Sequence, residues 1–149
     1  MSGTFRLQGI DELKSALRQF PEAAKRGGRR GLIKGSLRVQ RDAREAAPVD
    51  TGRLRASIGY QVQTMMNGVK AIIGMASKYA KYREFGTRAH FVPVQYIGRW
   101  AELHGLGRRG VFVSGRATPF LIPAAETNQH AVINDVVAEV RAELERLSR

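Results

Sequence analysis

A turn is predicted in Ala47-Pro48-Val49-Asp50-Thr51-Gly52-Arg53-Leu54-Arg55-Ala56-Ser57-Ile58, and it divides the sequence pattern into two parts. Pro48 cannot continue a helix, and Gly52 tolerates backbone conformations that are closed to other residues. The Asp50 side chain can accept hydrogen bonds from backbone amides ahead of it, as in turns and helix caps. The stretch therefore separates a helical pattern on its N-terminal side from an extended pattern on its C-terminal side.

The pattern before the turn predicts a long helix from about Pro21 to Ala46, since Pro21 suits a first helical position. A short strand or arm (residues 4–7) and a helix (residues 11–19) are predicted ahead of it. One face of the long helix carries small residues: Ala24, Gly28, Gly31, Gly35, Val39, Ala43 and Ala46. Each interior glycine costs about 1 kcal/mol relative to alanine. Either another backbone packs closely on this face, which we favour, or the helix bends near Gly27-Gly28.

Basic residues form a second stripe on the same helix, which their spacing places opposite the small face: Arg26, Arg30, Lys34, Arg38 and Arg41. Like charges three or four residues apart repel, so the stripe does not stabilise the isolated helix. The whole chain has 25 Lys and Arg against 13 Asp and Glu, a net charge of +12 that attracts polyanions. The stripe is interpreted either as a solvated face or as a contact for DNA or an acidic partner.

The pattern after the turn predicts a β-hairpin. A strand from about Ser57 to Met65 leads to Asn67-Gly68, a strong hairpin signal, and to a return strand over residues 69–74. By alternation, one face of the first strand carries Ile58, Tyr60, Val62 and Thr64, with Ala71 and Ile73 opposite them.

A short helix is expected to begin at Ser77 and to end at Gly86, with Tyr79, Tyr82 and Phe85 in the core. An excursion follows over residues 87–117, with a helix over residues 94–104 and a strand over residues 111–113. Phe120-Leu121-Ile122 is read as a last strand, after which Pro123 opens a helix to Leu147. The apolar stripe expected on that helix is Ile133, Val136, Val137, Val140, Leu144 and Leu147.

These elements predict an α+β fold, with a mostly antiparallel sheet packed against the long N-terminal-half helix and the C-terminal helix. The length of 149 residues suits a single domain spanning residues 1–149, with an excursion at about 87–117.

Residues that could carry chemistry are few and scattered. The chain has no cysteine, and His90, His104 and His130 lack the spacing of metal ligands. Gly105-x-Gly107-x-x-Gly110 has the spacing of a dinucleotide fingerprint but lacks the strand before it and the helix after it. Asp50 and Glu84 are interpreted as a cap and an ion-pair partner, which are simpler roles than catalysis. We therefore expect no enzyme, no cofactor and no metal; no apolar run approaches the roughly 20 residues that span a bilayer.

Three motifs nevertheless carry a resemblance: residues 47–58, Tyr79-Ala80-Lys81-Tyr82-Arg83-Glu84-Phe85-Gly86-Thr87 and Thr118-Pro119-Phe120-Leu121-Ile122-Pro123-Ala124. Their order, with Gly9-Ile10-Asp11-Glu12-Leu13 ahead of them, resembles the tail-completion or head–tail joining proteins at the neck of long-tailed bacteriophages, including lambda-like minor tail components. The resemblance implies that the following are positions of fold and assembly: Pro48, Asp50, Thr51, Gly52, Leu54, Tyr79, Glu84, Phe85, Gly86, Thr87, Pro119, Phe120 and Pro123.

The resemblance implies a structural virion protein that forms a ring between the head connector and the tail tube. Six copies are favoured and twelve are the alternative. The implied partners are the head connector and the tail terminator or tube proteins, with a passing contact with DNA and none with a membrane. The protein would be located in the virion, after assembly in the bacterial cytoplasm. Two alternatives stay open: a sequence-neutral DNA-binding protein that uses the basic helix, and a small basic nuclease or toxin.

Overall fold

The computed structural model describes residues 21–105 and 110–147, which divide into two compact units. Unit 1 contains the described residues up to Ala76 and from Phe120 onward, and unit 2 spans Ser77–Pro119. The predicted arm (residues 4–7) and first helix (residues 11–19) lie outside the described residues. Whether both units form a single domain stays a prediction.

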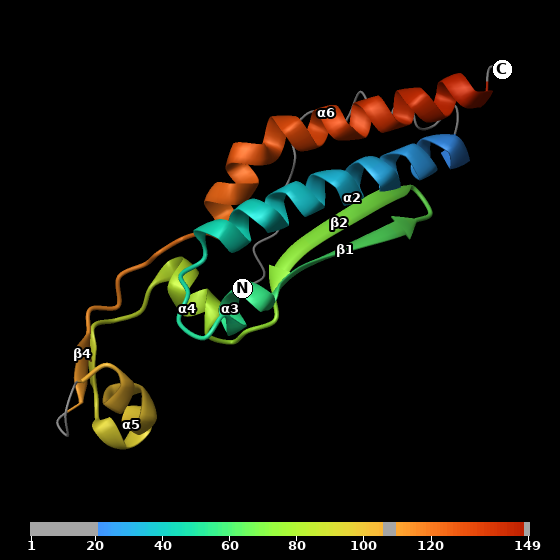
Figure 1. The fold of residues 1–149 in the computed structure, drawn as a ribbon. Coiled ribbons are helices and arrows are strands. Elements are labelled where there is room, and N and C mark those ends of the chain that lie inside the picture. Colours follow the sequence, from blue (N-terminus) through green and yellow to red (C-terminus); the bar gives the residue numbers. More distant parts are fainter. Residues whose placement is uncertain (1–20, 106–109, 148–149) are drawn as a thin grey trace. The chain divides into compact units, whose positions relative to one another are not determined.

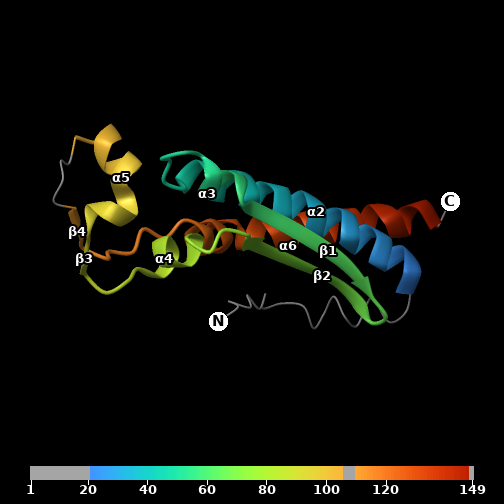
Figure 2. The same ribbon diagram turned by 90° about the horizontal axis from the view of Figure 1, so that it is seen from below.

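Unit 1 is built around α2 (Pro21–Ala46), which has the predicted bounds. On one side it packs against α6 (Leu121–Leu147), and on the other against the antiparallel hairpin of β1 (Ile58–Met65) and β2 (Gly68–Met75) (Figures 1 and 2). The short helix α3 (Arg53–Ala56), which was not predicted, connects α2 to β1. Because α2 has neighbours on two sides, its small residues are needed on more than one face.

The close packing predicted for the glycines of α2 is confirmed. A Cβ atom built on Gly27 would lie 2.6 Å from Val140 Cα, and one on Gly35 would lie 2.7 Å from Val132 Cγ1. From the first pair to the second, the contacting positions advance by eight residues along α2 and retreat by eight along α6, so the two helices are antiparallel. The predicted face needs two corrections: Gly28 faces the hairpin near Val69, and Ala46 is exposed.

The predicted alternation in the hairpin is also confirmed. Tyr60 pairs with Ile73 and Val62 with Ala71, while Ile58 at the start of β1 is 1% exposed. The turn lies one residue earlier than predicted, since Met65 already pairs with Gly68 and leaves residues 66–67 as the loop. This register places the apolar face of the hairpin on α2.

The last strand predicted at Phe120-Leu121-Ile122 is wrong, because α6 begins at Leu121. Pro123 is tolerated there since the first helical turn does not need its missing N–H. The buried stripe of α6 also differs from the predicted one: it contains Val132, Val136 and Val140, whereas Val137 is exposed. Of the other predicted positions, Ile133 and Leu144 are half-buried, and the Leu147 side chain lies outside the described part.

Unit 2 contains α4 (Ala80–Phe85), β3 (His90–Val92), α5 (Val94–Leu103) and β4 (Val111–Val113). The helix and the strand predicted in the excursion are confirmed, with α5 one residue shorter than expected and bent at Ile97. β3 was not predicted. It pairs antiparallel with β4 and places Phe91 opposite Phe112.

The aromatic core predicted for unit 2 is wrong: Tyr79, Tyr82 and Phe85 are each about half exposed or more. In the six-residue helix α4, the buried positions are Ala80 and Glu84, four residues apart, so the aromatic residues project from its other sides.

The fold is α+β, as predicted, and the strands of residues 21–105 and 110–147 form two separate two-stranded antiparallel sheets. In the part of the chain that the structure describes, no helix is both long and apolar enough to cross a membrane.

Candidate functional site

The turn between α2 and β1 is held by its own backbone and by Arg55. Gly52 has φ +78°, which favours glycine, and its carbonyl accepts a hydrogen bond from the Ala56 amide at 2.9 Å. The Ser57 hydroxyl donates to the Leu54 carbonyl at 2.7 Å, and the Arg55 guanidinium donates to the Ala47 carbonyl at 3.3 Å. Leu54 is the buried anchor of the turn. The motif therefore fixes a backbone path.

The polar residues of this motif point to solvent. Asp50 and Thr51 are exposed and Pro48 is half-buried. The predicted cap is wrong, because α3 begins after Gly52 without a hydrogen bond from a capping side chain. Asp50 and Thr51 are thus available for contacts outside the chain.

In unit 2 the second motif ends at a tight backbone crossing. Gly86 ends α4 as predicted, but the predicted start at Ser77 is wrong, because α4 begins at Ala80. The Gly86 backbone has φ +78° and ψ 179°, a conformation open essentially only to glycine. A Cβ atom there would lie 2.7 Å from the Gly115 carbonyl oxygen, and the Thr87 amide donates to that same oxygen at 2.7 Å. Thr118 completes the crossing with its amide, which donates to the Arg83 carbonyl at 2.7 Å.

The third motif lies at the start of α6. Phe120 is fully buried and is one of the two largest side chains that the described residues bury completely. Ala124, one turn later, is also buried, whereas Pro119 and Pro123 are exposed. Leu54, Glu84 and Phe120 of the three motifs are therefore interior positions, and the prolines shape the chain around them.

The basic stripe of α2 faces acidic residues of α6. Arg38 contacts Asp135 at 2.9 Å, and Arg26 contacts Glu143 at 2.9 Å. Between these ends, Arg30 contacts Glu143 and Glu139, and Lys34 lies 3.8 Å from Asp135 and Glu139. We call this set the α2–α6 ion-pair row. Only Arg41 of the predicted stripe pairs elsewhere, with its neighbour Asp42.

The row corrects the predicted position of the stripe. Arg26, Arg30, Lys34 and Arg38 each precede Gly27, Gly31, Gly35 or Val39 by one residue, so the stripe borders the glycine face and does not lie opposite it. The stripe is also only partly solvated, since its cations have partners within the chain. Lys34 keeps about half of its side chain exposed.

The ion-pair row changes the pKa values of its members. Hydrogen bonds from Arg26 and Arg30 lower the pKa of Glu143 to about 2, and the Glu143 carboxylate raises the pKa of Arg30. Near the other end of α2, the Asn128 amide donates to Asp42 at 2.7 Å and, with Arg41, lowers the pKa of Asp42. These carboxylates therefore stay ionised at acidic pH.

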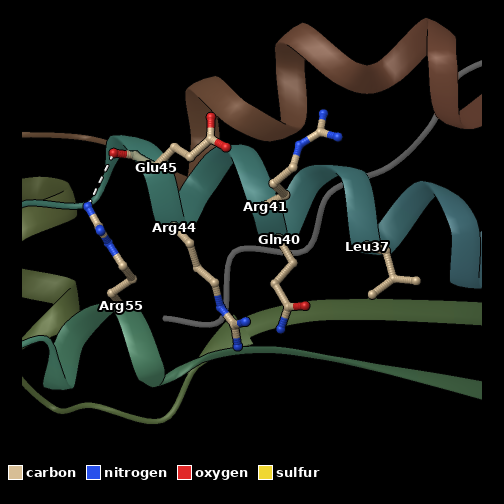
Figure 3. A pocket seen from close by; sticks show the side chains of 6 residues that line it. All are labelled: Leu37, Gln40, Arg41, Arg44, Glu45 and Arg55. Carbon is tan, nitrogen blue, oxygen red and sulfur yellow. Dashed lines mark hydrogen bonds between the residues drawn. The ribbon is translucent and has the colours of Figure 1, made fainter.

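A shallow open pocket lies between α2 and α3 and is lined by Leu37, Gln40, Arg41, Arg44, Glu45 and Arg55 (Figure 3). Figure 3 shows Arg41 extending toward α6 and Arg44 toward the strands. Gln40 and Arg44 both donate to the Ile58 carbonyl at 2.9 Å, so they tie β1 to α2. The guanidinium groups point in different directions and do not converge on one point. The lining residues instead hold the turn in place.

The histidines have separate environments. The Nδ1 atom of His90 lies 2.8 Å from the Arg88 carbonyl, and that of His104 lies 2.9 Å from the Trp100 carbonyl. His130 is exposed on α6. Among residues 21–105 and 110–147, no group of three or more His, Asp or Glu is placed to hold a metal ion.

The residues that the sequence analysis missed are the acidic partners Asp135, Glu139 and Glu143. A signal for them was present, because they recur every four residues on the last helix, as the cations do on α2. An antiparallel pairing of the two helices would have matched them.

The chain matches the model of a known protein family. The family described as "Bacteriophage HK97-gp10, putative tail-component" matches residues 11–86, slightly more than half of the chain. The match includes the turn motif and the second motif as far as Gly86. No curated protein and no solved structure matches the chain.

Proposed function

Because the chain belongs to the HK97-gp10-like family of bacteriophage tail components, we propose that it is a ring subunit of the virion neck. In this proposal the ring joins the head connector to the tail tube. Membership of the family makes the protein a structural component of the virion. Its position at the neck and its assembly into a ring are what we propose in addition.

The observation that carries the proposal is the role of the matched motifs. Gly52 and Gly86 hold backbone conformations that suit glycine, and Leu54 and Glu84 are buried beside them. Asp50, Thr51, Tyr79 and Phe85 lie on the surface of these fixed segments. A rigid turn that presents side chains outward is what a subunit needs to meet its neighbours in an assembly.

For the copy number we favour six, the symmetry of the tail, over twelve, the symmetry of the portal. The proposed neighbours are the head connector and the tail terminator or tube proteins. Assembly would take place in the bacterial cytoplasm. The proposal gives no residue a catalytic role, and the family is one of structural proteins.

The experiment is a phage in which a nonsense codon stops synthesis of this chain. Electron microscopy of the lysate should show filled heads and complete tails lying separate, and supplying the chain from a plasmid should restore joined particles. Joined and infectious particles made without the chain would contradict the neck role.

The basic helix supports the DNA-binding alternative less well than its charge suggests, because four of its five stripe residues have acidic partners on α6. Their contact with DNA or an acidic partner stays a prediction. Micromolar binding of the purified chain to duplex DNA, with a steep dependence on salt, would favour this alternative. Metal-stimulated cleavage of nucleic acid that is lost in Asp50→Ala or Glu84→Ala would favour a nuclease.

A further inference from the structure

Unit 2 carries a large share of the chain's positive charge. Residues 77–119 contain eight Lys and Arg against two Glu, a net charge of +6, which is half of the +12 of the whole chain. Six of these cations lie in the described residues: Lys78, Lys81, Arg83, Arg88, Arg99 and Arg116. A surface of this kind attracts acidic partners.

The same unit exposes large apolar side chains. Phe91 and Phe112 are direct partners in the β3–β4 pair and so lie on one face of that hairpin, where they are 55% and 67% exposed. On α5, Tyr96 is 75% and Leu103 is 76% exposed. Large exposed apolar side chains such as the Phe91–Phe112 pair are typical of interaction sites on soluble proteins.

Unit 2 has little interior with which to hold itself together. Among residues 77–105 and 110–119, the buried side chains are Ala80, Glu84 and Ala101. A single two-stranded hairpin is at most marginally stable in water, and units near 40 residues usually need disulfides, metals or a partner. The chain has no cysteine for a disulfide, and a partner that covers the exposed apolar side chains would add stability to unit 2.

A second copy of this chain offers unit 2 few acidic groups. In the described part of unit 1, five of the nine acidic residues pair with cations of the same chain: Glu22, Asp42, Asp135, Glu139 and Glu143. Unit 2 itself is basic. We therefore infer that the complementary charge comes from a different molecule.

The apolar side chains favour a protein over DNA as that molecule. Protein–DNA interfaces are polar and rich in phosphate contacts, to which Phe112 and Leu103 contribute nothing. Aromatic residues and arginine are both enriched at protein–protein interfaces and among the residues that contribute most to binding. Arginine also binds carboxylates through two hydrogen bonds at once.

We propose that unit 2 docks on an acidic surface of a different virion protein, with Phe91, Phe112 and Tyr96 at the centre of the contact. Arg88 and Arg99 contribute the charge around it. The inference rests on the proposed function for the statement that the partner belongs to the virion. The inference adds which part of the chain makes the contact and what chemical character the partner surface has.

Site-specific photocrosslinking in assembled particles tests the inference. Benzoylphenylalanine replaces Tyr96 in one phage stock and Phe112 in another, and Ile72 on β2 is the control position, since it is exposed on unit 1. After irradiation of purified virions, positions 96 and 112 should form adducts with a second virion protein. The crosslinked segment of that protein should be rich in Asp and Glu, and position 72 should not reach it.

Other outcomes overturn the inference. Adducts at 96 and 112 with DNA, with another copy of this chain, with a segment poor in acidic residues or with nothing would contradict the docking alone. Absence of the chain from purified virions would contradict the proposed function as well. The two failures are therefore distinguishable in one preparation.

Charge reversal gives a second readout. The double variant Arg88→Glu, Arg99→Glu should reduce the number of joined particles by about tenfold or more, because like charges would then face each other across the interface. The matched control is Arg29→Glu, an exposed cation of α2, which should stay within about twofold of the wild type. All three side chains are exposed, so melting temperatures should remain close to that of the wild type. Normal joining by the double variant would overturn the assignment of these arginines.

Discussion

Gly31 of α2 lies so close to Val136 of α6 that a methyl group on Gly31 would overlap the backbone of Val136. One turn earlier, a methyl group on Gly27 would likewise overlap the backbone of Val140, and one turn later, a methyl group on Gly35 would overlap the side chain of Val132. The ion-pair row borders this contact. The α2–α6 pair therefore combines a backbone contact that only small residues permit with charges that fix its register.

We predict that Gly31→Ala destabilises the protein by about 1–3 kcal/mol, the usual cost of overfilling a packed interior. Gly28→Ala, on the same helix, is the matched control. Its Cβ would lie 3.9 Å from Val69 Cγ2, an ordinary contact, and alanine favours the helix by up to about 1 kcal/mol. Urea denaturation measures both free energies of unfolding. Equal effects of the two substitutions would contradict the close contact.

We predict that reversing Arg30, Lys34 and Arg38 to Glu lowers the free energy of unfolding. The new carboxylates would face Asp135, Glu139 and Glu143, so attraction across the row becomes repulsion. Reversing the three acids to Lys in the same chain should restore much of the loss. Thermal denaturation at low and high salt measures this, and an unchanged melting temperature of the first variant would show that the stripe is a solvated face.

We predict that stability falls as the pH drops toward 2. The pKa of Glu143 is about 2 in the folded chain against an ordinary value of 4.5. A lowered pKa means that the unfolded chain binds the proton more tightly than the folded chain. The contribution of ionised Glu143 to the free energy of unfolding is therefore complete above pH 4.5 and is lost as the pH falls through 2. The lowered pKa of Asp42 acts in the same direction.

Free energies of unfolding measured from pH 7 to pH 2 test this sign. Glu143→Gln should flatten the acid limb of the profile, whereas Glu126→Gln, at an exposed position of α6, should leave the profile unchanged. An acid limb of the same slope in Glu143→Gln would contradict the assigned pairing.

We predict that Gly86→Val damages folding of unit 2 more than a substitution at Gly52 damages unit 1. Both glycines have φ +78°, but a Cβ at Gly86 would meet the Gly115 carbonyl, whereas nothing lies within 4 Å of one at Gly52. Asparagine tolerates the left-handed conformation of Gly52, so Gly52→Asn should cost about 1 kcal/mol or less. Hydrogen exchange of the Thr87 and Thr118 amides measures the effect at Gly86, and unchanged protection would contradict the crossing.

Local signals predicted the elements of unit 1 well. The bounds of α2 follow from Pro21 and Pro48, and the face of the hairpin follows from alternation between Ile58 and Val62. The strand predicted at residues 120–122 was wrong because three apolar residues suit either a strand or a buried helical turn. Only the packing of α6 decides between them.

Unit 2 was predicted less well because its burial does not follow side-chain size. Ala80 and Glu84 are interior, while Tyr82 and Phe85 are exposed. Hydrophobicity assigns aromatic residues to a core, and a surface that has a partner reverses that rule. The ion-pair row was missed for another reason: its two halves are about a hundred residues apart, and their shared four-residue spacing is visible only when both helices are considered together.

A reconstruction of the intact virion by electron cryomicroscopy tests the central claim most directly. The account predicts that this chain forms a closed ring between the head connector and the tail tube, with residues 77–119 against a different protein. Density for the chain at the tail tip or inside the head, or particles that contain none of it, would contradict the account.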